Sequence, residues 1–169
     1  MLGRHGAIDE MSRQVSLAAP FFLDKSDTAS WKALNGLSLK VKEAADAAGL
    51  STRLIELLNV RISQINGCSF CLDMHARLAL EAGETTQRLA VLSTWRETSL
   101  FDDLESAALS VAEAATSLPD SETRIAELAA SRLVLDDAQF SAVQWAAIAM
   151  NAVNRVSILS QHPVRASKK

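Results

Sequence analysis

Hydrophobic residues recur along this chain with gaps of three and four positions, and polar breaks separate the segments that carry them. That period is typical of amphipathic α-helices, whereas half-buried β-strands alternate at every second residue. Ala, Leu, Glu, Lys and Arg, which favour helices, dominate these segments. Alternating β-branched runs bounded by hairpin turns are missing from the sequence. The pattern therefore predicts an all-α fold.

Start and stop signals set the bounds of the predicted helices. Ser51 is placed to cap one helix, Asp102 and Glu105 have the spacing of a capping box, and Gly49 and Gly83 are placed to end helices. The predicted segments are 28–49 (one helix, or two joined near Gly36), 51–65, 68–82, 84–95 (a short helix and then a turn), 102–118, 121–132 and 136–159.

No linker, low-complexity tract or internal repeat separates these segments. A chain of 169 residues is long enough to bury a core of its own. We therefore expect residues 1–20 to be a partly ordered N-terminal extension and residues 21–169 to form a single helical domain.

Composition narrows the class of protein. Apolar residues make up 49% and charged residues 22% of the chain, which is typical of a globular protein. The formal net charge is −3, and no basic stripe exists beyond the short tail RASKK, so we expect no nucleic-acid partner. No apolar run approaches the roughly 18 residues of a membrane span, so we expect no membrane partner. The first residues lack the apolar core of a signal peptide, which favours a cytoplasmic location.

Both cysteines of the chain lie in one short motif. Cys68 and Cys71 are separated by two residues, and His75 follows four residues after the second cysteine. At about 100° per residue, these three side chains fall within roughly 60° of one another on a helix. They are therefore expected on the buried face of the predicted helix 68–82, whereas Ser69 and Asp73 lie on its other side.

This spacing favours redox chemistry. In a reducing compartment, cysteine pairs are more often catalytic or metal-binding than structural disulfides. Two cysteines at i and i+3 in a first helical turn can close a disulfide with little backbone movement. Unpaired N–H groups at the start of a helix favour a thiolate, so we expect a pKa below the usual value of about 8.5. His75 can exchange a proton with Cys71 one turn away. These are the parts of two-electron thiol chemistry, for which we expect no cofactor.

Other interpretations of the motif are less favoured. A zinc site could use both cysteines and His75, but His5 and His162 stand alone near the termini and no second ligand cluster completes it, so we expect no metal. Covalent haem attachment needs a histidine directly after the second cysteine, where this chain has Leu72. A thioredoxin-like site would follow a strand, whereas the preceding segment is predicted to be helical. Simple packing of two small apolar side chains is the remaining alternative.

Residues outside the motif carry weaker signals. Glu56 points away from the apolar stripe of the predicted helix 51–65, and by itself it is interpreted as a solvated glutamate. That stripe consists of Leu54, Leu57, Leu58, Ile62 and Ile65. Trp95–Glu97 fit a subunit contact or a turn with one packed indole equally well. Asn151 and Asn154 are expected to bond a neighbouring loop, and Trp145, Ile148 and Ala149 to lie in a core or an interface.

Glu56, Cys68, Cys71 and His75 together form the frame E-x11-C-x2-C-x3-H. This frame resembles the AhpD-like alkyl hydroperoxidases of the carboxymuconolactone decarboxylase superfamily, over roughly residues 45–160. The resemblance implies an all-α AhpD-like helical domain, assembly into homo-oligomers (trimers or hexamers) and reduction of organic hydroperoxides by cysteine.

The resemblance also implies a role for each residue of the frame. Cys71 attacks the peroxide, and Cys68 resolves the resulting sulfenic acid into a disulfide. Glu56 and His75 relay the proton, with water between them. A dithiol or lipoyl-type electron-donor protein then reduces the disulfide. In many Cys-x2-Cys helices the first thiol is the nucleophile, which would favour Cys68, but proximity to His75 and the resemblance both favour Cys71.

Two differences from members of this superfamily affect the activity that the resemblance implies. Phe70 stands where AhpD proper has a histidine just before the second cysteine, so one proton-handling group is absent, which affects the rate and the choice of donor. The decarboxylase branch lacks the cysteine pair, so decarboxylation is not expected. A non-enzymatic oligomeric redox sensor, or a disulfide-exchange protein using the same cysteines, is the alternative function.

Overall fold

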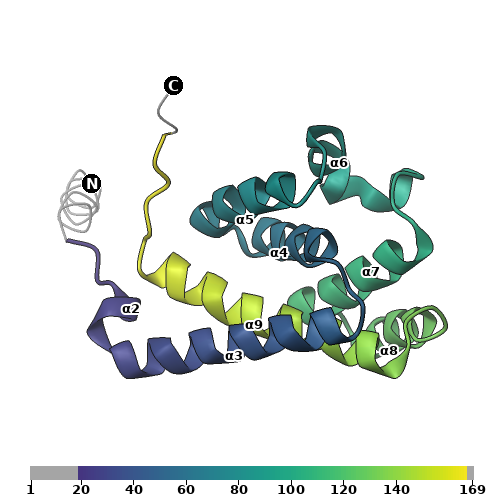
Figure 1. Cartoon of the computed structure of the whole chain (residues 1–169), viewed down its shortest axis with the longest axis horizontal. Coiled ribbons are helices and arrows are strands. Elements are labelled where there is room, and N and C mark those ends of the chain that lie inside the picture. Colours follow the sequence, from purple (N-terminus) through teal and green to yellow (C-terminus); the bar gives the residue numbers. More distant parts are fainter. Residues whose placement is uncertain (1–18, 167–169) are drawn as a thin grey trace, which may run out of the picture.

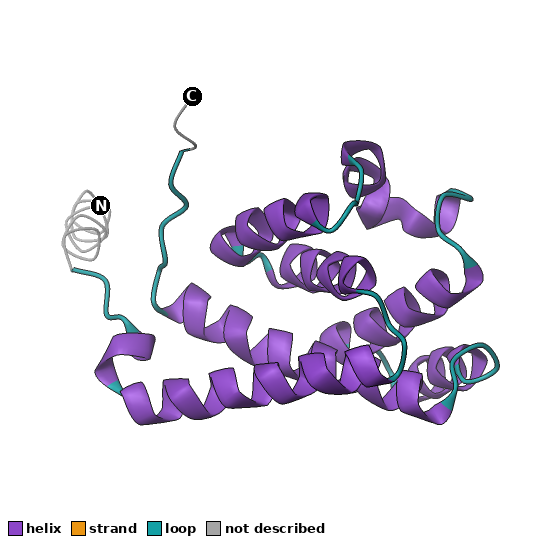
Figure 2. Cartoon of the chain, in the orientation of Figure 1, coloured by secondary structure: helices purple, strands orange, loops and turns teal. Residues whose placement is uncertain are grey.

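The computed structural model describes residues 19–166, and these residues form helices and turns without a strand (Figure 2). The elements are α2 (Leu23–Ser26), α3 (Thr28–Ala47), α4 (Thr52–Asn66), α5 (Ser69–Glu81), α6 (Thr86–Val91), the 3-10 helix η1 (Leu92–Glu97), α7 (Asp103–Ser117), α8 (Ser121–Ser131) and α9 (Asp137–Leu159). The prediction of an all-α fold is confirmed for this part of the chain. The extension predicted over residues 1–20 lies outside it, apart from the last two residues, and the division at residue 20 stays a prediction.

The helix ends follow the local signals in the sequence. Ser51 caps α4, and Asp102 with Glu105 forms the expected capping box at the start of α7. Helix α3 continues through Gly36 as one helix, which settles the choice between one helix and two. Gly49 has a positive φ of 74°, a conformation that only glycine adopts without strain, and it ends the turn after α3.

Helix α4 lies at the centre of the molecule. It contacts α5, α7 and α9, and it pairs with α5 as a helical hairpin (Figure 1). The two longest helices, α3 and α9, pack against each other below this hairpin (Figure 1). The largest fully buried apolar side chains include Leu57, Leu58, Val60, Ile62, Leu92, Leu109, Val111 and Val143. The apolar stripe predicted for α4 thus faces the core, which leaves the opposite side of α4 toward α3 and α5.

A buried amide cluster ties the end of α4 to α9. The Asn66 side chain donates hydrogen bonds to the Asn151 and Asn154 side chains, at 2.8 and 2.9 Å. Asn154, which is fully buried, donates in turn to Ser63 at 3.3 Å. The expectation of a neighbouring loop as their partner is therefore wrong, because both asparagines bond the last turn of a helix. This cluster holds the turn from which α5 starts.

The side chains of Trp95, Trp145 and Ile148 lie in different surroundings. The Trp95 indole is buried and donates to Glu113 at 3.0 Å, as expected for a turn with one packed indole. Ala149 is buried as well, but Trp145 and Ile148 are 48% and 50% exposed, so they do not belong to the core of this chain.

Among the described helices, none combines the length and the apolar character that crossing a bilayer requires.

Candidate active site

The turn between α4 and α5 places the first cysteine. Gly67 takes a left-handed conformation with φ of 69°, and the Cys68 backbone N–H donates to the Ser63 carbonyl at 3.0 Å. Cys68 is the N-cap of α5, so the helix starts one residue later than predicted. Its Sγ accepts the backbone N–H of Cys71 at 3.4 Å, in the position where a serine or aspartate oxygen usually caps a helix.

The two thiols and the imidazole share the buried face of α5, as predicted. Cys68 is 2%, Cys71 is 0% and His75 is 8% exposed, and both cysteines are free thiols. Cys71 and His75 line a cavity, whereas Cys68 lies behind this wall, toward α9. The two cysteines therefore have different surroundings although they are only three residues apart.

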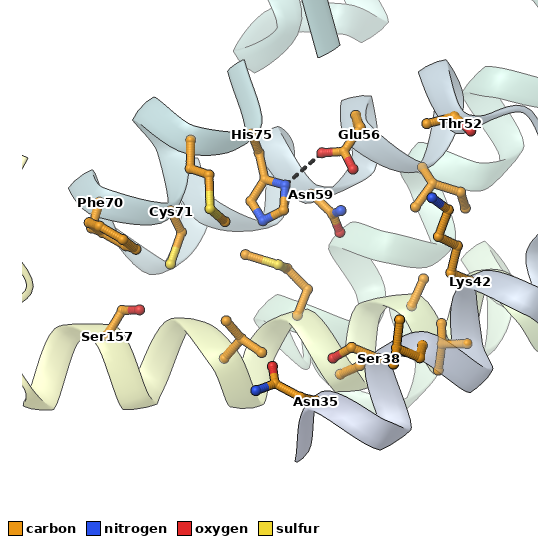
Figure 3. Close-up of a pocket in the computed structure, with 18 of the residues that line it drawn as sticks. Asn35, Ser38, Lys42, Thr52, Glu56, Asn59, Phe70, Cys71, His75 and Ser157 are labelled. Atoms are coloured by element: carbon orange, nitrogen blue, oxygen red, sulfur yellow. Dashed lines mark hydrogen bonds and ion pairs between the residues drawn. The ribbon is translucent and has the colours of Figure 1, made fainter. Parts of the chain in front are cut away.

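Glu56 reaches His75 from the neighbouring helix α4. His75 Nδ1–H donates to Glu56 Oε2 at 2.6 Å, since a carboxylate can only accept (Figure 3). Both side chains are largely buried, so the interpretation of Glu56 as a solvated glutamate is wrong. The contact is direct, and no water is needed between the two groups. With Nδ1 engaged, the neutral ring carries its lone pair on Nε2, which is free to accept a proton.

Burial raises the pKa of the Cys68 thiol to about 12, and the neighbouring Cys71 thiol acts in the same direction. The Cys71 backbone N–H and the Ser157 hydroxyl lower the pKa by hydrogen bonding, but by less. The expectation that the start of the helix lowers the thiol pKa is therefore wrong for Cys68. The cause is that Cys68, at the N-cap position of α5, is packed in the apolar core and has lost its contact with water.

The cavity has a volume of about 720 Å³ and lies between the α4–α5 hairpin and helices α3 and α9 (Figure 3). Much of its wall is apolar, with Trp31, Leu39, Ile55, Met74, Met150 and Val153 among the lining side chains. The polar groups of Glu56, Cys71 and His75 converge on one part of this wall. A large apolar cavity with a few convergent polar groups is the usual form of a small-molecule site.

His162 also lines this cavity, which the sequence analysis missed. Its Nε2 lies 3.1 Å from Asp24 Oδ1, and its Nδ1 lies 3.3 Å from Ser157 Oγ. The ring centroid is 5.1 Å from that of Phe70, the residue just before the second cysteine. The prediction that His162 stands alone is therefore wrong. No local signal could have shown this, because Asp24 and His162 are 138 residues apart in sequence.

Within residues 19–166, no three His, Cys, Asp or Glu side chains converge in a way that could hold a metal ion. The arrangement can instead support thiol chemistry. It brings together the Cys71 thiol at the cavity wall, the Cys68 thiol three residues earlier, and the His75 imidazole, which is hydrogen-bonded to the Glu56 carboxylate. Such a set can form a thiolate, accept an oxygen atom and close a disulfide.

Comparison with known proteins agrees with this geometry. Residues 29–114, which include all four residues of the frame, match the carboxymuconolactone decarboxylase family. The uncharacterized protein YdfG of Bacillus subtilis (strain 168) is 36% identical over 103 residues, which are 61% of this chain and 70% of YdfG. The uncharacterized protein YnjA of Escherichia coli (strain K12) is 36% identical over 63 residues, which are 37% of this chain and 35% of YnjA.

A solved structure shares the fold. ATU0492 of Agrobacterium tumefaciens superimposes with a TM-score of 0.77 at 28% sequence identity, covering 88% of this chain and 100% of ATU0492. ATU0492 is described as a protein of unknown function, with antioxidant defence protein AhpD as a suggested identity. The likeness confirms the predicted AhpD-like helical fold.

Proposed function

Because the chain belongs to the carboxymuconolactone decarboxylase family, we propose that it is a thiol-dependent peroxidase that reduces alkyl hydroperoxides through Cys71 and Cys68. The observation that carries the proposal is the 2.6 Å contact between Glu56 and His75, beside a thiol in the wall of an apolar cavity. The antioxidant role suggested for ATU0492 supports the same direction.

In the first step, Cys71 reacts with the hydroperoxide. His75 takes the proton of the Cys71 thiol, and Glu56 stabilises the imidazolium that results. The thiolate sulfur attacks the terminal peroxide oxygen, the O–O bond breaks, and the alkoxide leaves with the proton from His75 as an alcohol. Cys71 is oxidised to a sulfenic acid, and the hydroperoxide is reduced by two electrons.

In the second step, Cys68 resolves the sulfenic acid. Its sulfur attacks Cys71 Sγ, the S–O bond breaks, and the oxygen leaves as water, so that a Cys68–Cys71 disulfide remains. A dithiol or lipoyl-type donor protein then returns two electrons and two protons, which restores both thiols. This cycle needs no cofactor bound to the chain itself.

Two features favour Cys71 over Cys68 as the attacking thiol. Cys71 lines the cavity with His75, and a peroxide in the cavity would meet it first. Burial raises the pKa of Cys68 to about 12, so that thiol is protonated near neutral pH and is poorly suited to attack first. Cys68 as the first nucleophile therefore becomes the less favoured assignment.

The cavity wall supports an organic hydroperoxide as substrate. Side chains such as Trp31, Leu39 and Met74 offer apolar contact area to an alkyl or aryl group, which hydrogen peroxide cannot use. We therefore expect a lower KM for cumene or tert-butyl hydroperoxide than for hydrogen peroxide.

The exposed apolar side chains of α9 support assembly into a homo-oligomer, a trimer or a hexamer. Trp145 and Ile148 lie half-exposed one turn apart, and large exposed apolar groups on one helix face favour a partner. Light scattering at micromolar concentration tests this, and Ile148→Glu is expected to weaken the assembly. The cytoplasmic location stays an expectation.

A redox sensor or disulfide-exchange protein is the second candidate. Phe70 favours it, because this side chain can offer no proton at the position before the attacking cysteine, which would slow turnover. Both functions use a reversible Cys68–Cys71 disulfide, but only the peroxidase turns over repeatedly.

Steady-state turnover separates these candidates. The purified protein is mixed with cumene hydroperoxide and a chemical dithiol or a lipoylated donor, and consumption of peroxide is followed against Cys71→Ser at equal concentration. We expect repeated turnover that depends on Cys71. Oxidation that stops after one equivalent of peroxide would favour the sensor.

A further inference from the structure

A second histidine and carboxylate, His162 and Asp24, line the same cavity as Glu56 and His75. His162 Nε2–H donates to Asp24 Oδ1 at 3.1 Å, and His162 Nδ1 lies 3.3 Å from the Ser157 hydroxyl. The Ser157 hydroxyl in turn interacts with the Cys68 thiol. These contacts link Asp24, His162, Ser157 and Cys68 in series. The two steps of the proposed peroxidase reaction use neither Asp24 nor His162 nor Ser157.

The backbone at the end of α9 builds this chain. Gln161 takes a left-handed conformation with φ of 53°, and the His162 N–H donates to the Ser157 carbonyl at 3.1 Å. This is the pattern of a Schellman C-cap, and it folds His162 back over the last turn of α9. The Leu23 N–H donates to Ser160 Oγ at 3.0 Å, which joins the start of α2 to the same turn and brings Asp24 to the ring.

Aromatic packing fixes the ring in this position. Phe22 stacks on His162 with centroids 5.5 Å apart and an interplanar angle of 18°, and Phe70 packs at 5.1 Å. The side chains of His162 and Asp24 are only 14% and 19% exposed. The ring is therefore held with one nitrogen toward Asp24 and the other toward Ser157.

We propose that Asp24, His162 and Ser157 form a proton relay that serves Cys68, and that this relay removes the Cys68 proton when the disulfide with Cys71 closes. The assignment rests on the proposed function in one respect, since it takes Cys68 as the thiol that acts second. It gives the resolving thiol a base of its own, separate from the Glu56–His75 pair.

The step balances in protons and electrons. Cys68 S–H gives its proton to the Ser157 oxygen while the Ser157 hydroxyl proton passes to His162 Nδ1. The Cys68 sulfur attacks Cys71 Sγ, the S–O bond of the sulfenic acid breaks, and the leaving hydroxide takes up one proton from solvent in the cavity. His162 then releases its proton to solvent, so the sum is one disulfide and one water.

Every donor and acceptor of the relay has a hydrogen-bond partner both before and after the proton transfer. In the proposed relay, before the transfer, Cys68 S–H donates to Ser157, Ser157 O–H donates to Nδ1, and Nε2–H donates to Asp24. Afterwards, Nδ1–H donates to Ser157 and Ser157 O–H donates to the thiolate, while the Asp24 carboxylate faces the imidazolium. Asp24 and Ser157 act through their neighbours and are positioning residues.

The chemistry of Cys68 requires such a base. Its pKa of about 12 leaves only about one thiol in 10⁵ ionised at pH 7. Glu56 and His75 line the cavity beside Cys71, and Asp24 and His162 line the same cavity. Only the second pair is joined to the Cys68 thiol, through the Ser157 hydroxyl.

A peroxide-free assay tests the relay. The reduced protein is mixed with dithiobis(nitrobenzoic acid), which forms a mixed disulfide at Cys71 and releases one thionitrobenzoate. Attack of Cys68 on this mixed disulfide then releases the second. In His162→Phe, which keeps the aromatic stack and removes both nitrogens, we expect the second release to slow about tenfold or more, with the first release close to the wild-type rate. Ser157→Ala is expected to slow the same release.

The pH profile distinguishes a relay from a structural role. The titratable and charged groups near His162 are Asp24 and Lys25 from α2 and the two thiols, and Lys25 lies beyond the Phe22 ring. Ser157 from α9 is neutral. In wild type, the rate of the second release is expected to level off with rising pH once the relay accepts protons. In His162→Phe it is expected to rise about tenfold per pH unit, because hydroxide must replace the imidazole.

Ser131→Ala is the matched control, because it removes a buried serine hydroxyl that bonds only within α8, to the Glu127 carbonyl. It is expected to change neither release. Equal second-release rates in wild type, His162→Phe and Ser157→Ala would overturn the relay, as would a first release from Cys68 or the lack of a second release in wild type. Since no peroxide is present, a relay effect without peroxide turnover would reject only the proposed peroxidase.

Discussion

Two histidine–carboxylate pairs flank the cysteine pair, and the chain builds them in different ways. His75 and Glu56 are 19 residues apart, come from the two helices of one hairpin, and meet at 2.6 Å. His162 and Asp24 are 138 residues apart, come from opposite ends of the described chain, and meet at 3.1 Å. Both pairs line the cavity, but the first lies beside Cys71, whereas the second reaches Cys68 through Ser157.

The two pairs depend on the rest of the fold to different extents. The first pair is fixed once α4 and α5 form a hairpin, because both side chains project from regular helices that one tight turn joins. The second pair needs the C-cap of α9, the start of α2 and two aromatic rings to be in place together. It is a tertiary feature, and it can change while the first pair stays the same.

The largest effect is expected from the thiols themselves. Cys71→Ser should abolish peroxide turnover, because it removes the sulfur that accepts oxygen. Cys68→Ser should also stop repeated turnover, but Cys71 should still form a sulfenic acid, which dimedone labels and mass spectrometry detects. Labelling of Cys68 in Cys71→Ser, with none of Cys71 in Cys68→Ser, would reverse the two roles.

The pH dependence of Cys68 provides the next effect. Since burial and the Cys71 thiol raise its pKa to about 12, the Cys68 thiol keeps its proton far above the usual cysteine pKa of about 8.5. In Cys71→Ser the Cys71 contribution is lost but burial, the largest cause, remains, so alkylation of Cys68 by iodoacetamide should still rise about tenfold per pH unit to pH 9 without a plateau. The unfolded variant in guanidinium serves as control and should level off above pH 9. A plateau near pH 8 in the folded variant would contradict the buried environment of Cys68.

Glu56→Gln tests the cavity-side pair. The amide keeps the shape of the side chain but cannot stabilise the imidazolium, so we expect the rate of sulfenic acid formation to fall about 100-fold. Rapid mixing with cumene hydroperoxide measures this step. Glu81→Gln, an exposed glutamate on α5, is the matched control. Equal rates in wild type and Glu56→Gln would remove the cavity-side pair from the mechanism.

Much of the frame of this site could be predicted from the sequence. The helices follow from periodicity and capping residues, and the shared face of Cys68, Cys71 and His75 follows from helical spacing alone. Glu56 could not be assigned in this way, because periodicity describes one helix and does not say which neighbour packs on its polar side. Only the family frame pointed to it.

The Asp24–His162 pair could not be predicted from local sequence patterns. Asp24 lies in a four-residue helix, and His162 lies after the last helix, so neither belongs to a periodic segment. Their meeting depends on the Ser160–Gln161 turn and on packing between the two ends of the chain. The raised pKa of Cys68 was missed for the same reason, since the burial that causes it comes from core residues distant in sequence.

The amide cluster below the turn links both sides of the site. Asn154→Ala removes a buried side chain that accepts from Asn66 and donates to Ser63, so both residues lose one hydrogen bond, while Asn66 keeps Asn151 and Ser63 keeps the Asn59 carbonyl. We expect the free energy of unfolding to fall by about 1–3 kcal/mol. Chemical denaturation measures this value, with Ser141→Ala on the exposed face of the same helix as control. An unchanged stability would show that the cluster does not hold the turn.

The smallest effect is expected at Phe70, where the two pairs can be compared directly. AhpD proper resembles this chain but has a histidine at this position, and here the His162 ring lies 5.1 Å from the Phe70 ring. If His162 supplies the missing imidazole, Phe70→His alone should change turnover by less than about threefold, whereas in His162→Phe it should restore part of the second thionitrobenzoate release. Phe70→Leu removes the ring without adding a nitrogen and should restore nothing. A gain of about tenfold or more from F70H in the otherwise wild-type chain would mean that the histidine of AhpD proper has no counterpart in this site.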